Sequence, residues 1–201
     1  MNDLYRKASF LISAPNIRFA PADRGAEVAF VGRSNAGKSS AINVITSQGA
    51  LARTSKTPGR TQQLVFFELD PQRRLVDLPG YGYAHVARSV QDQWKHAMER
   101  YFEQRKSLLG LFLIMDIRHP MTPLDQQMIQ CCMADRSLHL LLTKSDKLSR
   151  GASKTILGQV ERFVETRKIH ASVQLFSALK KIGIDEAHEV LDAWFGIGSA
   201  A

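Results

Sequence analysis

The 201-residue chain is poor in cysteine, with two at the adjacent positions Cys131 and Cys132. Two cysteines are too few for a disulfide framework, and no cysteines and histidines have the spacing of a zinc site. We expect both on a helix, buried or half-buried. No apolar run approaches the roughly 18–20 residues of a membrane-spanning helix, and the first residues lack a signal-peptide pattern. The sequence therefore predicts a cytoplasmic protein that does not enter the membrane.

Acidic residues are outnumbered, 19 against 27 lysines and arginines, which gives a net charge of +8. A positive excess attracts polyanions, because their binding releases counterions. Charge alone leaves RNA binding and its absence equally open. Four phenylalanines, Phe10, Phe19, Phe66 and Phe67, can either stack on bases beside the basic residues or pack in the core. Core packing is the favoured interpretation.

The chain contains no internal repeat and no low-complexity linker, and strand-like segments alternate with helix-like ones. This order predicts an α/β fold with a largely parallel sheet flanked by helices. The first 22 residues contain Pro15 and Pro21 and form a lead-in without an assigned element, and residues 23–198 form a single domain. Expected strands cover residues 27–31, 63–69, 74–77, 109–116, 138–143 and 172–176. Expected helices cover residues 38–46, 90–105, 124–133, 154–167 and 184–195.

Residues 32–39 match the pattern G-x-x-x-x-G-K-[ST] between a strand and a helix, which is the context of a phosphate-binding P-loop. Glycines let the backbone wrap the phosphates, and the helix start adds free N–H groups and a positive dipole end. We expect Lys38 to neutralise the β- and γ-phosphates and the Ser39 hydroxyl to bind Mg²⁺. The predicted contacts are Gly32, Arg33, Ser34, Asn35, Ala36, Gly37, Lys38 and Ser39.

A second motif, D-L-P-G, closes the third expected strand with Asp77, Leu78, Pro79 and Gly80. Asp77 suits a carboxylate behind the Mg²⁺ shell, and the Gly80 N–H suits the γ-phosphate. Residues 53–62 between the two motifs are polar and basic, so they predict a loop. A threonine in this loop can complete the Mg²⁺ shell only when the γ-phosphate is present, which is an order–disorder switch. Thr61 is preferred because it adjoins the next strand, and Thr57 is the alternative.

A third motif, T-K-S-D, follows an apolar strand and consists of Thr143, Lys144, Ser145 and Asp146. The Asp146 carboxylate can accept hydrogen bonds from guanine N1–H and the 2-amino group. Adenine offers neither donor and would leave the carboxylate unpaired, which is costly. The Lys144 stem can lie along the base. The next expected strand ends at Phe176, Ser177 and Ala178, and the Ala178 N–H can reach guanine O6.

These motifs, with T-P-G-R-T-Q at 57–62, D-L-P-G-Y-G-Y-A at 77–84, M-D-I-R-H-P at 115–120 and S-A-L-K-K at 177–181, resemble the EngB (YihA/YsxC) family of bacterial ribosome-biogenesis GTPases. The resemblance covers residues 18–195. It implies a Ras-like P-loop fold with a mostly parallel six-stranded sheet, and Mg²⁺ ligation by Ser39 and Thr61. It also implies nucleotide contacts by Gly59, Arg60, Thr61, Gln62 and Gln63. The family is linked to assembly of the large ribosomal subunit, whose RNA or proteins are the expected partners, and to cell division and septation.

The expected reaction is in-line attack of water on the γ-phosphate of GTP, giving GDP and phosphate, with Lys38, Thr61, Gly80 and Asn35 as the catalytic set. Ras-type GTPases orient the water with a glutamine just after D-x-x-G, where this chain has Tyr81. We therefore predict slow intrinsic turnover, with a partner or an ion supplying what is missing. Asn35 either helps to hold K⁺ at the phosphates or caps the backbone, and both alternatives stay open.

Asp116 ends a strand, and we expect it to pair with Arg118 or to cap a helix rather than to act in catalysis. Two other functions compete with a GTP-hydrolysing monomer. A P-loop metabolic kinase or ATPase would not explain T-K-S-D. A non-catalytic scaffold that holds GTP would bind the nucleotide without releasing phosphate.

Overall fold

The structure is a computed structural model that describes residues 3–53, 63–82, 88–132 and 136–198. Every strand and helix predicted from the sequence is present, with ends that differ by a few residues at most. In chain order the elements are α1 (Asp3–Arg6), β1 (Ser9–Ala14), η1 (Ile17–Phe19), β2 (Ala26–Gly32), α2 (Lys38–Ile45), β3 (Leu64–Asp70), β4 (Arg73–Asp77), α3 (Arg88–Gln104), β5 (Leu108–Asp116), α4 (Pro123–Cys132), β6 (Ser137–Thr143), η2 (Ser145–Lys147), α5 (Arg150–Thr166), β7 (Ala171–Leu175) and α6 (Ile184–Phe195).

The strands of the described residues form one seven-stranded sheet in the order β1-β3-β4-β2-β5-β6-β7. The five strands β4, β2, β5, β6 and β7 run parallel, and β3 is antiparallel to both of its neighbours. Parallel pairing requires a crossover, and the helices between the strands provide it. The predicted α/β class with a mostly parallel sheet is confirmed.

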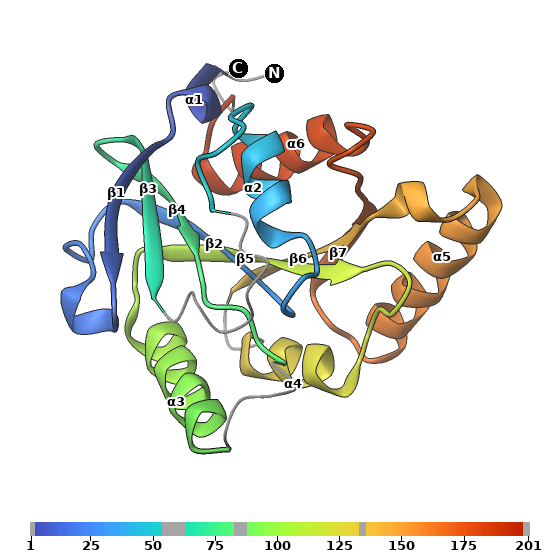
Figure 1. Cartoon of the computed structure of the whole chain (residues 1–201), viewed down its shortest axis with the longest axis horizontal. Helices are drawn as coiled ribbons and strands as arrows, with labels where there is room; N and C mark the ends of the chain where they lie inside the picture. Colours follow the sequence, from blue (N-terminus) through green and yellow to red (C-terminus); the bar gives the residue numbers. More distant parts are fainter. Residues whose placement is uncertain (1–2, 54–62, 83–87, 133–135, 199–201) are drawn as a thin grey trace.

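Helices cover both faces of this sheet (Figure 1). One hydrophobic cluster joins the sheet to α1, α2 and α6, and includes Tyr5, Ile42 and Leu191. The other joins the opposite face to α3, α4 and α5, and includes Tyr101 and Val160. The central strands β2, β5 and β6 are therefore buried on both sides, which explains their continuous apolar runs.

The predicted number of six strands is wrong, because the lead-in supplies a seventh. β1 pairs antiparallel with β3 and carries a bulge between Phe10 and Ile12. Most residues of β1 are exposed, and the bulge interrupts its pairing, so the segment lacks the apolar–polar alternation by which a strand is predicted from sequence. The same lead-in contributes Tyr5, which is fully buried.

Three single-residue predictions about burial are also wrong. Phe66 and Phe67 pack in the core as expected, but Phe10 and Phe19 are 61% and 60% exposed. Phe10 lies on β1 at the sheet edge, where neither face is fully covered. Phe19 ends η1, which contains no buried residue. Cys131 lies on α4, as predicted, but its side chain is exposed.

Candidate functional site

The predicted motifs meet at one edge of the sheet. The P-loop follows β2, D-L-P-G follows β4, T-K-S-D follows β6 and residues 176–178 follow β7. Because these strands are parallel neighbours, their carboxyl ends lie at the same edge, where ligands bind in open α/β sheets. Segments more than 100 residues apart in sequence therefore form one site.

The P-loop takes its shape from residues that tolerate unusual backbone conformations. Asn35 has φ 62° and Gly37 has φ 98°, both in the left-handed region that glycine and asparagine adopt most readily. A Cβ on Gly32 would lie 2.5 Å from the Ile114 carbonyl oxygen, so only glycine lets β2 approach β5 this closely. α2 begins directly after Gly37, and its first-turn N–H groups face the loop. The loop is thus an anion-binding cradle.

Two charged residues predicted to handle phosphate and Mg²⁺ are in contact. The Lys38 ammonium, at the start of α2, forms an ion pair with the Asp77 carboxylate at the end of β4. The side chains are 11% and 6% exposed. Asp77 pairs with Phe30 of β2, and the Leu78 N–H donates to the Phe30 carbonyl at 2.9 Å. The strand pairing therefore places the D-L-P-G turn beside the P-loop.

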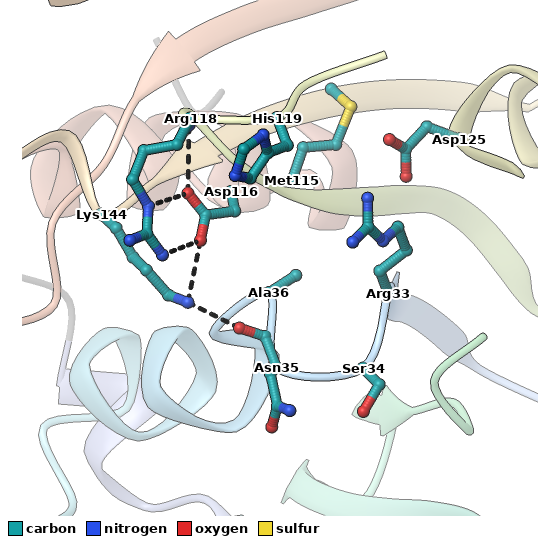
Figure 2. Close-up of a pocket in the computed structure, with 10 residues that line it drawn as sticks. All are labelled: Arg33, Ser34, Asn35, Ala36, Met115, Asp116, Arg118, His119, Asp125 and Lys144. Carbon is teal, nitrogen blue, oxygen red and sulfur yellow. Dashed lines mark hydrogen bonds and ion pairs between the residues drawn. The ribbon is translucent and has the colours of Figure 1, made fainter. Parts of the chain in front are cut away.

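The T-K-S-D motif is fastened to the P-loop. The Thr143 hydroxyl donates to the Ala36 carbonyl. Lys144 has φ 58°, and its ammonium donates to the Asn35 carbonyl at 2.7 Å. The same ammonium lies 3.0 Å from a carboxylate oxygen of Asp116 (Figure 2). The Lys144 stem thus spans the space between the phosphate cradle and the end of β6.

Asp116 is a site residue that sequence reasoning understated. Its predicted pairing with Arg118 is confirmed, at 2.9 Å to Nε and 2.6 Å to Nη2. Burial alone would raise the pKa of Asp116, but hydrogen bonds from Arg118 and Lys144 outweigh it and hold the pKa well below its usual range. The contact with Lys144 was missed. The signal for it is that β5 and β6 are consecutive strands, which places their ends next to each other.

Asp146, predicted to recognise guanine, has its carboxylate fixed from one side. The Ser177 hydroxyl donates to Asp146 Oδ1 at 2.5 Å and accepts the Lys180 N–H at 3.1 Å. The Ser145 N–H donates to the Phe176 carbonyl at 3.1 Å, which joins the loops after β6 and β7. The Asp146 side chain is 8% exposed. A nearly buried, oriented carboxylate distinguishes purines by their hydrogen-bond donors.

A small cavity of about 160 Å³ lies between the P-loop and the end of β5 (Figure 2). Arg33, Ser34 and Asn35 line it from the P-loop, Asp116 lines it from the last position of β5, and His119 lines it from the segment that follows. The Asn35 side chain points away from the Asp116 group in this view. Its amide is therefore separate from the contacts that hold its own carbonyl.

Four of the predicted nucleotide contacts, Gly59, Arg60, Thr61 and Gln62, and the alternative Thr57, lie outside the described residues. The assignment of Thr61 to Mg²⁺ and to catalysis stays a prediction. Gln63, the next predicted contact, is exposed just before β3 and accepts a hydrogen bond from Ser13 of β1.

The residues present suit Mg²⁺, which prefers hard oxygen ligands and keeps several waters. Ser39 supplies a hydroxyl on the first turn of α2, and Asp77 supplies a carboxylate that contacts the preceding residue, Lys38. Within the described ranges, no three histidine, cysteine, aspartate or glutamate side chains gather to hold a metal. This donor set suits an ion that takes most of its ligands from phosphate and water.

Comparison with known proteins agrees with this geometry. The family described as 50S ribosome-binding GTPase matches residues 27–144. A probable GTP-binding protein EngB of Salmonella paratyphi B is 53% identical over 192 residues, which are 95% of this chain and 91% of that protein. The homologue of Shigella flexneri is 52% identical over the same lengths. The chain belongs to the EngB family of GTP-binding proteins.

Solved structures support the fold of this EngB-family chain. A crystal structure of a probable GTP-binding protein engB superposes with a TM-score of 0.69 at 21% identity, covering 85% of this chain and 99% of that one. A structure of Era in complex with MgGDPNP and a 16S ribosomal RNA segment superposes with a TM-score of 0.65 at 18% identity, covering 85% and 57%. The Ras-like P-loop fold is thus established. No helix among the described residues has the length and apolarity needed to cross a bilayer.

Proposed function

We propose that this EngB-family protein hydrolyses GTP slowly with Mg²⁺ and acts in the cytoplasm as a nucleotide-dependent switch in assembly of the large ribosomal subunit. The observation that carries the proposal is the Asp146 carboxylate, oriented by Ser177 and joined through Lys144 to the phosphate cradle. One arrangement then selects guanine and places its phosphates over the P-loop. The family's link to cell division and septation follows in this proposal as a consequence of the same switch.

Selection of guanine depends on unequal hydrogen bonding. Ser177 occupies Asp146 Oδ1 from the protein side, so the carboxylate is held in one orientation. Guanine N1–H and the 2-amino group would both donate to it, while the Ala178 N–H would donate to guanine O6. Adenine would offer this nearly buried carboxylate no donor from the base, and Asp146 would keep only its protein partners Ser177 and Lys147. That penalty disfavours the P-loop kinase or ATPase alternative.

Phosphate binding uses the P-loop amides of residues 32–39, the Lys38 ammonium and the Gly80 N–H. Ser39 and Thr61 would hold Mg²⁺, with Asp77 behind them, and the bound ion would supply positive charge to offset that of the phosphates. The residues position the γ-phosphate for in-line attack by water and stabilise the charge that develops. Tyr81 offers no amide to orient that water, so intrinsic turnover is slow. Asn35 is the candidate for a K⁺ ligand, and a comparison of turnover in K⁺ and Na⁺ at equal ionic strength tests this.

The ribosomal partner is supported by charge and by family. The net charge of +8 favours ribosomal RNA, and the matching family is described as ribosome-binding. The protein acts as a monomer that gains affinity for the large subunit in one nucleotide state. Co-sedimentation with isolated large subunits, in GDP and in a non-hydrolysable GTP analogue, should therefore give unequal binding. Equal binding, or none in either state, would contradict the switch.

Calorimetric titration with GDP, GTP and ATP tests the base site directly. Wild type should prefer guanine nucleotides, and Asp146→Asn should lose about 100-fold in GDP affinity and gain affinity for xanthosine diphosphate, because it removes two charge-assisted hydrogen bonds. Asp185→Asn, an exposed position on α6, is the matched control and should bind like wild type. A preference for ATP would favour the kinase alternative. Binding without phosphate release, with or without large subunits, would favour the scaffold.

A further inference from the structure

Tyr81, which stands where Ras-type GTPases have a glutamine, is buried and makes a specific bond of its own. Its ring is 4% exposed, and its hydroxyl donates to Asp125 Oδ1 on α4 at 2.5 Å. We propose that Tyr81 is a positioning residue, and that the Tyr81–Asp125 hydrogen bond is a latch that ties the D-L-P-G turn to α4 until a γ-phosphate releases it. This inference rests on the proposed function and names a residue that would regulate the same site.

Both backbone polar groups of Tyr81 form hydrogen bonds with the P-loop. Its N–H donates to the Gly32 carbonyl at 3.2 Å, and its carbonyl accepts the Ser34 N–H at 2.9 Å. Its ring packs against Trp94 of α3 at 5.7 Å between centroids, and the Trp94 indole N–H donates to the Pro79 carbonyl at 3.2 Å. Tyr81 therefore connects the P-loop, α3 and α4, and follows Gly80 directly. A movement of Gly80 cannot leave Tyr81 unaffected.

Asp125 has two separate tasks, one for each carboxylate oxygen. Oδ2 accepts the N–H and the hydroxyl of Thr122 at 2.8 and 2.7 Å, as in a helix capping box. Among the described residues, Oδ1 accepts a hydrogen bond from the Tyr81 hydroxyl alone, and Asp125 is 1% exposed. The cap of α4 explains the hydrogen bonds to Oδ2, but it does not explain the hydrogen bond between Oδ1 and the Tyr81 hydroxyl. If Tyr81 withdrew, a buried carboxylate oxygen would lose its donor, so α4 would have to adjust.

The latch is closed in the arrangement that pairs Lys38 with Asp77. Either nucleotide would compete for the Lys38 ammonium through its β-phosphate, but only a triphosphate would draw the Gly80 N–H towards a γ-phosphate. This pull acts on residues 77–80, next to Tyr81 on the same turn. The latch should therefore oppose binding of the triphosphate more than binding of the diphosphate. Its removal should shift the affinity ratio towards the triphosphate.

The test compares Tyr81→Phe, Asp125→Ala, the double variant and Thr122→Ala in the full chain. Affinities for GDP and for GppNHp, a non-hydrolysable GTP analogue, are measured by calorimetry with Mg²⁺. Tyr81→Phe and Asp125→Ala should each raise the preference for GppNHp over GDP about tenfold or more, the size expected for one buried hydrogen bond to a charged acceptor. The double variant should add nothing further. Thr122→Ala, which breaks the cap and spares the latch, should lower stability and keep the ratio.

Two readouts report the movement itself. In a Trp194→Phe background, Trp94 fluorescence should change when GppNHp replaces GDP, and the change should shrink in Tyr81→Phe. Amide exchange in α4 should depend on the nucleotide in wild type and lose that dependence in Tyr81→Phe. An affinity ratio within twofold of wild type in Tyr81→Phe, or a shift towards GDP, would overturn the latch. Wild type that binds neither nucleotide would instead overturn the proposed function.

Discussion

Glu27 carries the most sharply testable contribution to stability. It lies near the start of β2, is fully buried, and accepts from Arg105 Nε at 2.8 Å and from Arg105 Nη2 at 2.6 Å. Arg74, its register partner on β4, lies 3.1 Å from Glu27 Oε1. The side chains of Arg105 and Arg74 are 3% and 6% exposed. The Glu27 carboxylate is therefore the buried anion shared by two nearly buried guanidinium groups, and Arg105 has a partly exposed second partner in Asp23 at 3.7 Å.

Glu27→Gln keeps the shape of the side chain and removes the charge. Arg74 would then be buried without an anion among the described residues, and Arg105 would keep only the partly exposed Asp23 at 3.7 Å. Removing one partner from a buried ion pair typically costs about 3–5 kcal/mol. For a chain of this length that corresponds to a fall in melting temperature of about 10 °C, and to a urea midpoint lower by about 2 M. The guanidinium groups also donate to the carbonyls of Pro21, Ala22 and Arg24, so residues 21–24 should loosen as well.

Urea unfolding followed by circular dichroism measures the loss, and GDP affinity should stay unchanged because the cluster lies at the amino ends of the strands. Asp3→Asn, in the exposed Asp3–Arg6 pair at 3.8 Å, is the control and should have no measurable effect. An apolar triple replacement, Glu27→Leu with Arg74→Met and Arg105→Met, should cost less than Glu27→Gln, because it leaves no unpaired charge. A loss below about 1 kcal/mol in Glu27→Gln would refute this reasoning.

Two further outcomes follow from the same structure. Asp116→Ala should raise the dissociation rate of GDP about fivefold in stopped-flow measurements, because Lys144 loses its partly exposed ion pair with Asp116. A slower rate would contradict the role of Asp116 in positioning Lys144. Burial lowers the pKa of His139 to about 4 despite a hydrogen bond with Gln174. The unfolded chain therefore binds more protons than the folded one between about pH 6.5 and 4, and the free energy of unfolding should fall by up to about 3 kcal/mol as the pH falls across that window. His139→Gln should flatten this pH dependence in unfolding experiments.

The site could be predicted where its chemistry is local in sequence. The P-loop and T-K-S-D each hold their donors within eight residues and follow strands whose apolar runs are unmistakable. Parallel pairing then brings them together without further information. The same locality explains why strand and helix positions were predicted closely for the buried elements.

The missed features depend on pairing between distant segments. β1 has exposed apolar residues and a bulge, and its assignment requires the edge of β3 as a partner. The bond from Tyr81 to Asp125 joins residues 44 positions apart, and the contact of Lys144 with the Asn35 carbonyl joins residues 109 apart. No spacing rule connects such residues, because the distances are fixed only when the sheet order and the helix packing are known.

Ion pairs at the amino ends of the parallel strands and at their carboxyl ends serve different purposes. At the amino ends of the strands, Glu27 pairs with Arg74 and Arg105. The two arginines also donate to backbone carbonyls, and Arg105 lies 3.7 Å from Asp23, so the cluster serves stability. At the carboxyl edge, Lys38 has Asp77, and Lys144 has Asp116 and one carbonyl. A nucleotide brings its own negative charge and must compete with these carboxylates for the lysines. Because binding would then yield the difference between two ion-pair energies rather than one whole energy, the carboxyl edge suits the reversible phosphate binding that the proposed switch requires.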